Sequence, residues 1–209
     1  QADTPRDPLD RAWANALADM ASRYPDDTTV ASVYAEALMN TMPWDYWGPD
    51  GEAKPDTQAV IASLEAAMDA DPDHPLALHL YIHALEASSN AAKAEPVADR
   101  LANLVPGSGH LVHMPSHIYF RVGRYQESAL ANIRAAEVDE AYIAQCNAQG
   151  FYPALYYPHN IHFLWASATM QGQSALSLRS ARRVVANVRV EQVEQLEQLE
   201  HERLDARGR

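Results

Sequence analysis

Three histidines lie close together in the segment GHLVHMPSHIYF, residues 109–120. His110, His113 and His117 stand at positions i, i+3 and i+7, which share one face of an α-helix. Imidazole nitrogens are ligands of transition-metal ions, and histidines three or four residues apart on a helix can bind one ion together. The segment therefore indicates a helix face that binds a metal.

Two more histidine pairs have the same kind of spacing. His79 and His83 are four residues apart, and His159 and His162 are three residues apart. A single histidine on a helix is more often a hydrogen-bonded structural residue than a ligand. Several neighbouring imidazoles cannot all ionise, however, and each needs partners for its ring nitrogens, which a divalent transition metal provides.

The elements that must position these residues are helices. Alanine-rich segments such as RAWANALADMASRY and TQAVIASLEAAMDADP place apolar residues three and four apart, and alternation typical of strands is nearly absent. Each segment is short and ends in a turn signal such as YPDD or VPGSG. The pattern predicts an all-α chain of paired antiparallel helices.

The histidines recur with a repeat. When DPDHPLALHLYIHALEAS is placed over VPGSGHLVHMPSHIYFRVG at an offset of 34 residues, His79 falls on His113 and His83 on His117. A third copy, YPHNIHFLWASATMQG, fits at an offset of 49 residues, with an insertion near residues 141–157. Pro115 leaves two alternatives for the second copy: a helix from Gly109 that Pro115 interrupts, or a helix that begins at Pro115.

These motifs resemble the tetratricopeptide repeat (TPR) superfamily over roughly residues 10–187, and VGRYQESALANIRAAEVD has the glycine, tyrosine and alanine of its turn and second helix. Together with YAEALMNTMPWDYW and YYPHNIHFLW, they are similar to a histidine-rich bacterial group of mostly uncharacterised TPR proteins. The resemblance implies a right-handed superhelix of antiparallel helix pairs, a TPR-like α-solenoid. The expected organisation is a repeat domain at 1–187, with helix pairs near 10–42, 55–106, 109–140 and 158–187 and the insertion at 141–157, followed by a polar terminal helix or tail at 188–209.

The resemblance also implies that the first helix of each pair lines a concave groove. The groove positions then include seven of the nine histidines. The expected metal ligands are His79, His83, His110, His113, His117, His159 and His162. Glu86 and Glu36 fall on the same wall and are the expected acid or base. We expect groove side chains to pack little, so that replacing His83 or His117 by alanine should barely disturb folding.

The ligand types favour zinc, copper, nickel or iron over magnesium or calcium. One or two ions are expected. With two ions, one site would lie around His79, His83 and His117 and the other around His110, His159 and His162, with His113 available to either. Three or four histidines per ion are within reach. The aromatic segments PWDYWGPDG and GFYPALYYPHN are either loop packing or lids over the groove.

Charge and composition exclude several classes of protein. The formal net charge of −12 repels phosphate backbones and anionic lipid heads, so no nucleic-acid or membrane partner is expected. No stretch approaches the ~20 apolar residues that span a bilayer. A single cysteine, Cys146, excludes an internal disulfide. We expect a soluble, bacterial protein, cytoplasmic or exported after removal of a leader.

Three functions remain open. The first is a metalloprotein that acts on a small substrate, as a metal-dependent hydrolase or oxidase. The second is a scaffold that binds an extended peptide or protein partner in the groove, and the third is a metal store or sensor without turnover. The tail VEQVEQLEQLEHERLDARGR has a three-residue period that drifts around a helix, and His201 in it is expected to be solvated. Because repeat stacks need polar caps, a partner or further chain is expected at the ends of the array.

Overall fold

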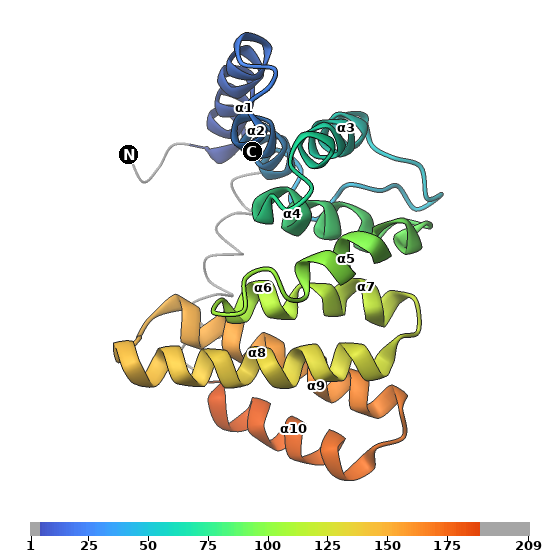
Figure 1. Ribbon diagram of the computed structural model, residues 1–209, viewed down its shortest axis with the longest axis vertical. Coiled ribbons are helices and arrows are strands. Elements are labelled where there is room, and N and C mark those ends of the chain that lie inside the picture. Colours follow the sequence, from blue (N-terminus) through green and yellow to red (C-terminus); the bar gives the residue numbers. More distant parts are fainter. Residues whose placement is uncertain (1–4, 189–209) are drawn as a thin grey trace. The chain divides into compact units, whose positions relative to one another are not determined.

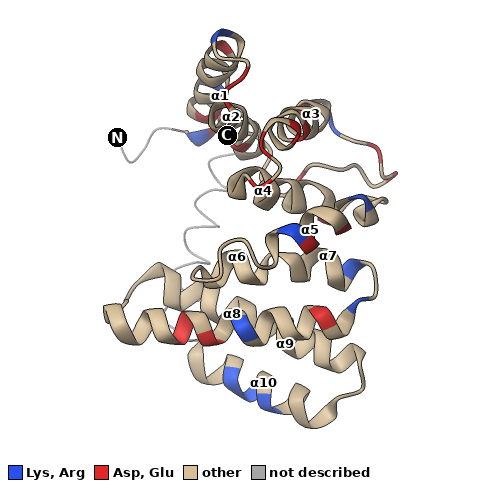
Figure 2. Cartoon of the chain, viewed as in Figure 1, with Lys and Arg blue, Asp and Glu red and all other residues tan. Residues whose placement is uncertain are grey.

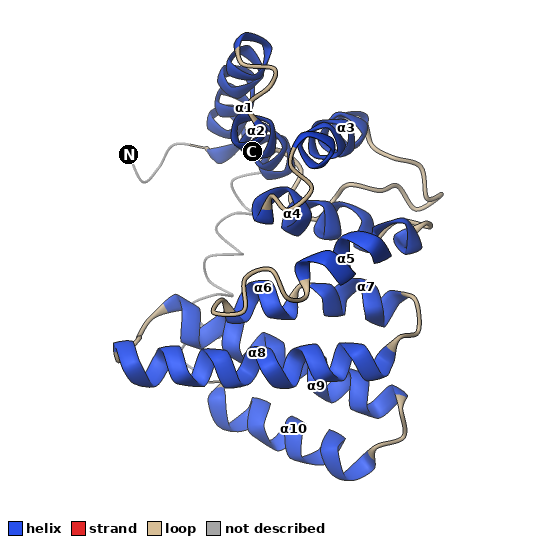
Figure 3. Ribbon diagram, viewed as in Figure 1, coloured by secondary structure: helices blue, strands red, loops and turns tan. Residues whose placement is uncertain are grey.

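The computed structural model describes residues 5–188, and these residues are mainly helical (Figure 1). No strand occurs among them apart from an isolated bridge between Trp47 and Ala53 (Figure 3). The helices are α1 (Arg6–Arg23), α2 (Thr28–Asn40), α3 (Pro55–Ala70), α4 (Pro75–Glu86), η1 (Ala91–Ala94), α5 (Glu95–Leu101), α6 (Gly109–His113), α7 (Pro115–Arg121), α8 (Tyr125–Cys146), η2 (Tyr152–Tyr156), α9 (Tyr157–Met170) and α10 (Ser174–Asn187). The predicted all-α class is confirmed. No described helix has both the length and the apolar character needed to cross a membrane.

The chain divides into two compact units, which are described separately. Unit 1 comprises Gln1–Val105 and His117–Val122, and unit 2 comprises Pro106–Ser116 and Gly123–Arg209. The predicted tail from residue 189 onward, with His201, lies outside the described residues.

In unit 1, consecutive helices pack against one another: α1 on α2, α2 on α3, and α3 on α4. The starts of two of these helices have side-chain caps. The Asp27 carboxylate accepts a hydrogen bond from the Val30 amide at the start of α2, and His74 Nδ1 accepts one from the Ala77 amide at the start of α4. Pro75 takes the first position of α4, where no backbone donor is required. His74, outside the predicted ligand set, is therefore a helix cap.

Side chains of α3, α4 and α5 form the core of unit 1. Leu64, Leu78, Ile82 and Leu101 are fully buried. Tyr81 is also buried, and its hydroxyl donates to Glu65 Oε1 across the α3–α4 pair at 2.7 Å. Lys93 pairs with the same carboxylate. This packing fixes the rotation of α4 about its axis, and with it the direction of the side chains on its other face.

In unit 2, α8 packs against α6 and α9, and α9 packs against α10. The alternative in which the helix begins at Gly109 is confirmed. α6 starts there after Ser108, whose hydroxyl accepts from the Leu111 amide, and the helix is interrupted at Met114, just before Pro115. Part of the expected insertion at 141–157 extends α8 to Cys146, and another part forms the π-helical turn η2.

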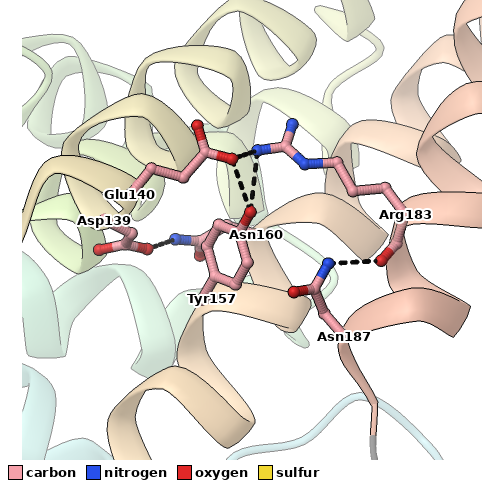
Figure 4. Close-up of polar contacts among 6 residues, drawn as sticks. All are labelled: Asp139, Glu140, Tyr157, Asn160, Arg183 and Asn187. Atoms are coloured by element: carbon pink, nitrogen blue, oxygen red, sulfur yellow. Dashed lines mark hydrogen bonds and ion pairs between the residues drawn. The ribbon is translucent and has the colours of Figure 1, made fainter. Parts of the chain in front are cut away.

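Polar contacts tie α8, α9 and α10 together (Figure 4). The Tyr157 hydroxyl donates to Glu140 Oε1 at 2.7 Å, and Arg183 bonds to both residues. Asn160 Nδ2 donates to Asp139 Oδ2 at 2.7 Å in the same interface. Because Tyr157 and Asn160 both lie on the first turn of α9, these bonds fix how that helix starts.

Candidate metal centre

Helix α4 presents His79, His83 and Glu86 on one face, because these residues stand at i, i+4 and i+7. The opposite face is the apolar one that packs in the core, whereas the three polar residues are only partly buried. The ring centres of His79 and His83 are 4.9 Å apart. Helix α4 therefore supplies two imidazoles and a carboxylate to one place.

His117, in the part of α7 that belongs to unit 1, completes this group. Its Nδ1 lies 2.8 Å from Glu86 Oε1, and only 5% of the residue is exposed. A carboxylate accepts and does not donate, so Nδ1 carries the proton in this bond and the lone pair of a neutral His117 is on Nε2. Metal-binding histidines have the same arrangement, in which a carboxylate holds the ring through the nitrogen that does not face the metal.

The distances between the rings suit a shared ion. Two imidazoles bound to one ion through bonds of ~2.1 Å, at angles of about 90–110°, have ring centres about 5 Å apart. The ring centres of His83 and His117 are 5.2 Å apart. One potential ligand atom from each of His83, Glu86 and His117 lies within 4.8 Å of the others. His79, His83, His117 and Glu86 are called the unit 1 cluster below.

The protonation of His79 also suits metal binding. Burial lowers the pKa of His79 to about 4, with a further contribution from the charge of His117. His79 is therefore neutral at pH 7. Since metal ions bind the neutral imidazole, no proton has to be displaced from His79 at that pH.

The loop between α2 and α3 reaches the unit 1 cluster. The indole of Trp44 lies edge-on to His83, with ring centres 5.0 Å apart. Trp47 anchors the loop on α4 by donating from Nε1 to the Ala84 carbonyl at 2.7 Å. The contact of Trp44 with His83 favours the expectation that this aromatic segment is a lid over the histidines. Trp47 instead packs the loop against α4.

Unit 1 also carries almost all of the net negative charge. It contains 18 acidic and 7 basic side chains, a formal charge of −11, whereas unit 2 has a formal charge of −1. Figure 2 shows only basic charged residues on α10, at the end of the described part of unit 2. The field around unit 1 therefore attracts cations.

In unit 2, His113 is fully buried and its tautomer is fixed by a chain of hydrogen bonds. Asn132 Nδ2 donates to the Ser128 carbonyl at 2.8 Å, so Asn132 Oδ1 must be the atom 2.6 Å from His113 Nδ1. An amide oxygen only accepts, so Nδ1 carries the proton and Nε2 has the lone pair. Sequence reasoning missed Asn132 because it considered only the first helix of each pair. The signal was an asparagine four residues after Ser128 in an alanine-rich helix.

Other aromatic residues of unit 2 surround His113. The ring centre of His159 lies 4.7 Å away and that of Phe163 lies 5.0 Å away. His110 stacks at 6.0 Å and itself contacts Tyr156 of η2 at 4.8 Å. The second aromatic segment of the sequence therefore contacts a histidine, as the first does.

Two expected site residues lie apart from the converging ligand groups, and one expectation about packing is wrong. His162 is exposed on α9, where its ring lies 5.3 Å from that of Trp165, and it belongs to no group of converging ligand atoms in the described chain. Glu36 is likewise exposed and outside every such group. The expectation that groove side chains pack little is wrong for His117, because this residue is buried and hydrogen-bonded to Glu86.

Comparisons with known proteins give a structural likeness only. No model of a protein family matches the chain, and no functionally curated protein matches it in sequence. Among solved structures, MamA 41-end from Desulfovibrio magneticus RS-1 is similar, with a TM-score of 0.61 and 13% identity over 83% of this chain and 82% of that one. The MamA RS-1 ArsTM double mutant is similar with a TM-score of 0.64 and 13% identity, over 87% of this chain and 86% of that one.

At this level of identity the likeness concerns the fold alone. The similarity to MamA over most of the chain supports the TPR-like α-solenoid fold that the sequence resemblance implied. The polypeptide described here has the all-α fold of a TPR-like α-solenoid.

Proposed function

We propose that this protein binds a transition-metal ion through His79, His83 and His117 of unit 1, with Glu86 holding His117 in the binding tautomer. The convergence of ligand atoms from His83, Glu86 and His117 within 4.8 Å supports this proposal most directly. His79, whose ring centre lies 4.9 Å from that of His83, is the third imidazole of the proposed set.

Neutral imidazoles favour zinc, copper, nickel or iron over magnesium and calcium, which prefer oxygen ligands. The formal charge of −11 on unit 1 supports a cationic ligand and disfavours an anionic one. In this proposal Glu86 is a positioning residue, because its bond to His117 occupies the carboxylate. The acid or base role expected for Glu86 and Glu36 is not part of it.

We propose a second ion in unit 2, bound by His113 and His159 with His110 beside them. The fixed tautomer of His113 directs a lone pair away from Asn132, and the 4.7 Å separation from His159 suits a shared ion. Among the described residues of unit 2 alone, no three ligand atoms converge as those of His83, Glu86 and His117 do in unit 1, so we expect weaker binding. His162 has no role in it.

A metal titration tests the proposal. The full chain, purified in metal-free buffer, should bind Zn²⁺, Ni²⁺ or Cu²⁺ at micromolar concentration or below in calorimetry, with one tight ion per chain and a second, weaker one. His83→Ala and His117→Ala should each remove the tight ion, because each takes one imidazole from a set of three. His162→Ala is the matched control, because it removes an exposed histidine from unit 2.

Tight binding that survives both unit 1 substitutions would disprove the site. Absence of any binding at micromolar metal would disprove the metalloprotein altogether. The peptide-binding scaffold would then be the remaining function, and the acidity of unit 1 would favour a basic peptide.

A further inference from the structure

The backbone of Trp44 has an unusual conformation. Its φ angle is +60°, in the left-handed region that bulky residues rarely adopt. Residues in such conformations persist only where the surrounding structure enforces them, and they cluster at functional sites. Glycine or asparagine would adopt this conformation more readily, so the presence of tryptophan at this position needs an explanation.

The packing of Trp44 itself does not provide that explanation. The residue is 70% exposed, so the indole buries little apolar surface. Its main described contact is the edge-on approach to His83. The strained backbone and the exposed indole are therefore not explained by burial. We look for their role in the contact between the indole and His83.

The residues that follow Trp44 hold it in place. Tyr46 is buried, and its carbonyl accepts hydrogen bonds from Thr57 Oγ1 at 2.6 Å and from the Lys54 amide at 3.0 Å. Trp47 is tied to the Ala84 carbonyl of α4, one residue after His83. These anchors fix the loop on the helix that carries His79 and His83, so the indole is positioned relative to those rings.

We propose that Trp44 caps the metal ion of the unit 1 cluster, an inference that rests on the proposed function. His117 is buried and Trp44 is exposed, so the indole lies on the solvent side of the cluster. In that position it obstructs the approach of outside ligands larger than water. The ion is then held by the three imidazoles and one small ligand, and it exchanges slowly.

The cap also distinguishes between the kinds of metalloprotein. Catalytic ions keep a position that substrate can reach, whereas structural and storage sites are closed to it. A capped ion suits a protein that holds or senses the metal. Removal of the indole should let larger outside ligands reach the ion without removing a protein ligand.

Co²⁺ is the probe for this test, because its visible spectrum reports the number and type of its ligands. The full chain, Trp44→Ala and Trp44→Gly are each loaded with Co²⁺. The first measurement is the change in the visible spectrum when azide is added, and the second is the rate at which Co²⁺ is released to excess EDTA. Trp13→Ala is the matched control, since Trp13 lies on α1 and is 53% exposed. Circular dichroism checks that each variant is folded. Glycine adopts the left-handed conformation without strain, so Trp44→Gly is the variant to interpret if Trp44→Ala folds poorly.

We expect azide to leave the spectra of the parent protein and of Trp13→Ala unchanged and to shift those of both Trp44 variants. Release of Co²⁺ to EDTA should be about tenfold faster in the Trp44 variants, in the range that residues around a metal's ligands control. If the variants resist azide and release Co²⁺ at the parental rate, or if azide already binds the parent, the cap is wrong while the proposed function stands. If the parent protein binds no Co²⁺, both proposals fail.

Discussion

Glu86 Oε1 lies 2.8 Å from His117 Nδ1, although the two residues are 31 positions apart in the chain. The bond links α4 to α7 within unit 1 and is partly buried, so solvent competes with it only weakly. It sets which ring nitrogen of His117 carries the proton. A charged acceptor also makes the imidazole a better electron donor to a metal.

Replacement of Glu86 should therefore weaken metal binding without changing its stoichiometry. We expect Glu86→Ala to lower the affinity of the tight site by about 10- to 100-fold, the usual effect of losing an outer hydrogen-bond partner. Glu86→Gln keeps an acceptor oxygen and should lose less. Calorimetric titration with Zn²⁺ measures both. Complete loss of the tight ion in Glu86→Gln as well as in Glu86→Ala would instead make the carboxylate itself a ligand.

The metal-free protein should lose stability in mild acid because of His79. The pKa of His79 is about 4 in the folded protein, below the ordinary value of 6.5, owing first to burial and then to the charge of His117. The unfolded chain therefore takes up a proton at higher pH than the folded chain. The stabilisation is fully present above pH 6.5 and is lost as the pH falls toward 4, by an amount on the order of 3 kcal/mol.

Urea denaturation of the metal-free protein at several pH values measures this dependence. His79→Gln removes the titrating group and should flatten the curve between pH 6.5 and 4. An equally steep loss of stability in the variant would assign the pH dependence to other groups.

The all-α fold and the four residues of the unit 1 cluster could be predicted from local sequence. Helix periodicity placed His79, His83 and Glu86 on one face, and α4 begins at Pro75, as the alignment required. The 34-residue repeat put His83 in register with His117, and their rings lie close together. These features could be predicted because they depend only on the spacing of residues along one helix or on the exact 34-residue repeat.

Other features depend on contacts that spacing does not specify. Trp44 reaches His83 through the conformation of an irregular loop, and Asn132 reaches His113 from the second helix of a pair. His162 is exposed, although the alignment that named it also named His159, which lies beside His113. The start of α9 depends instead on the bonds from Tyr157 and Asn160 to α8, and these leave His162 toward solvent.

His113 should contribute to stability as well as to any metal site. The side chain is fully buried, and its removal leaves Asn132 Oδ1 without its donor. We expect His113→Ala to destabilise the metal-free protein by about 1–3 kcal/mol, the cost of an unsatisfied buried polar group. His162→Ala, which removes an exposed ring, should change stability by less than about 0.5 kcal/mol. Thermal unfolding compares the two, and equal midpoints would contradict the buried bond.

The start of α6 should tolerate no side chain at residue 109. A Cβ atom placed on Gly109 would lie 1.9 Å from Asp139 Oδ1 and 3.0 Å from the Ala135 carbonyl oxygen. Asp139 has little room to move, because it is buried and accepts hydrogen bonds from the Tyr152 hydroxyl at 2.6 Å and from Asn160 Nδ2 at 2.7 Å. Gly109→Ala must therefore push α6 away from α8 or break these bonds.

We expect Gly109→Ala to lower the free energy of unfolding by about 1–3 kcal/mol, as overpacking of a close contact does. The displacement would also move His110, so binding of the weaker ion proposed for unit 2 should decline while the tight ion of unit 1 is kept. Gly107→Ala is the control, because no atom lies within 4 Å of a Cβ at that position. Urea denaturation and a Zn²⁺ titration of both variants measure the two effects. Equal stability of Gly109→Ala and Gly107→Ala would mean that α6 is not held tightly against Asp139, and the geometry assigned to His110 and His113 would then lose its support.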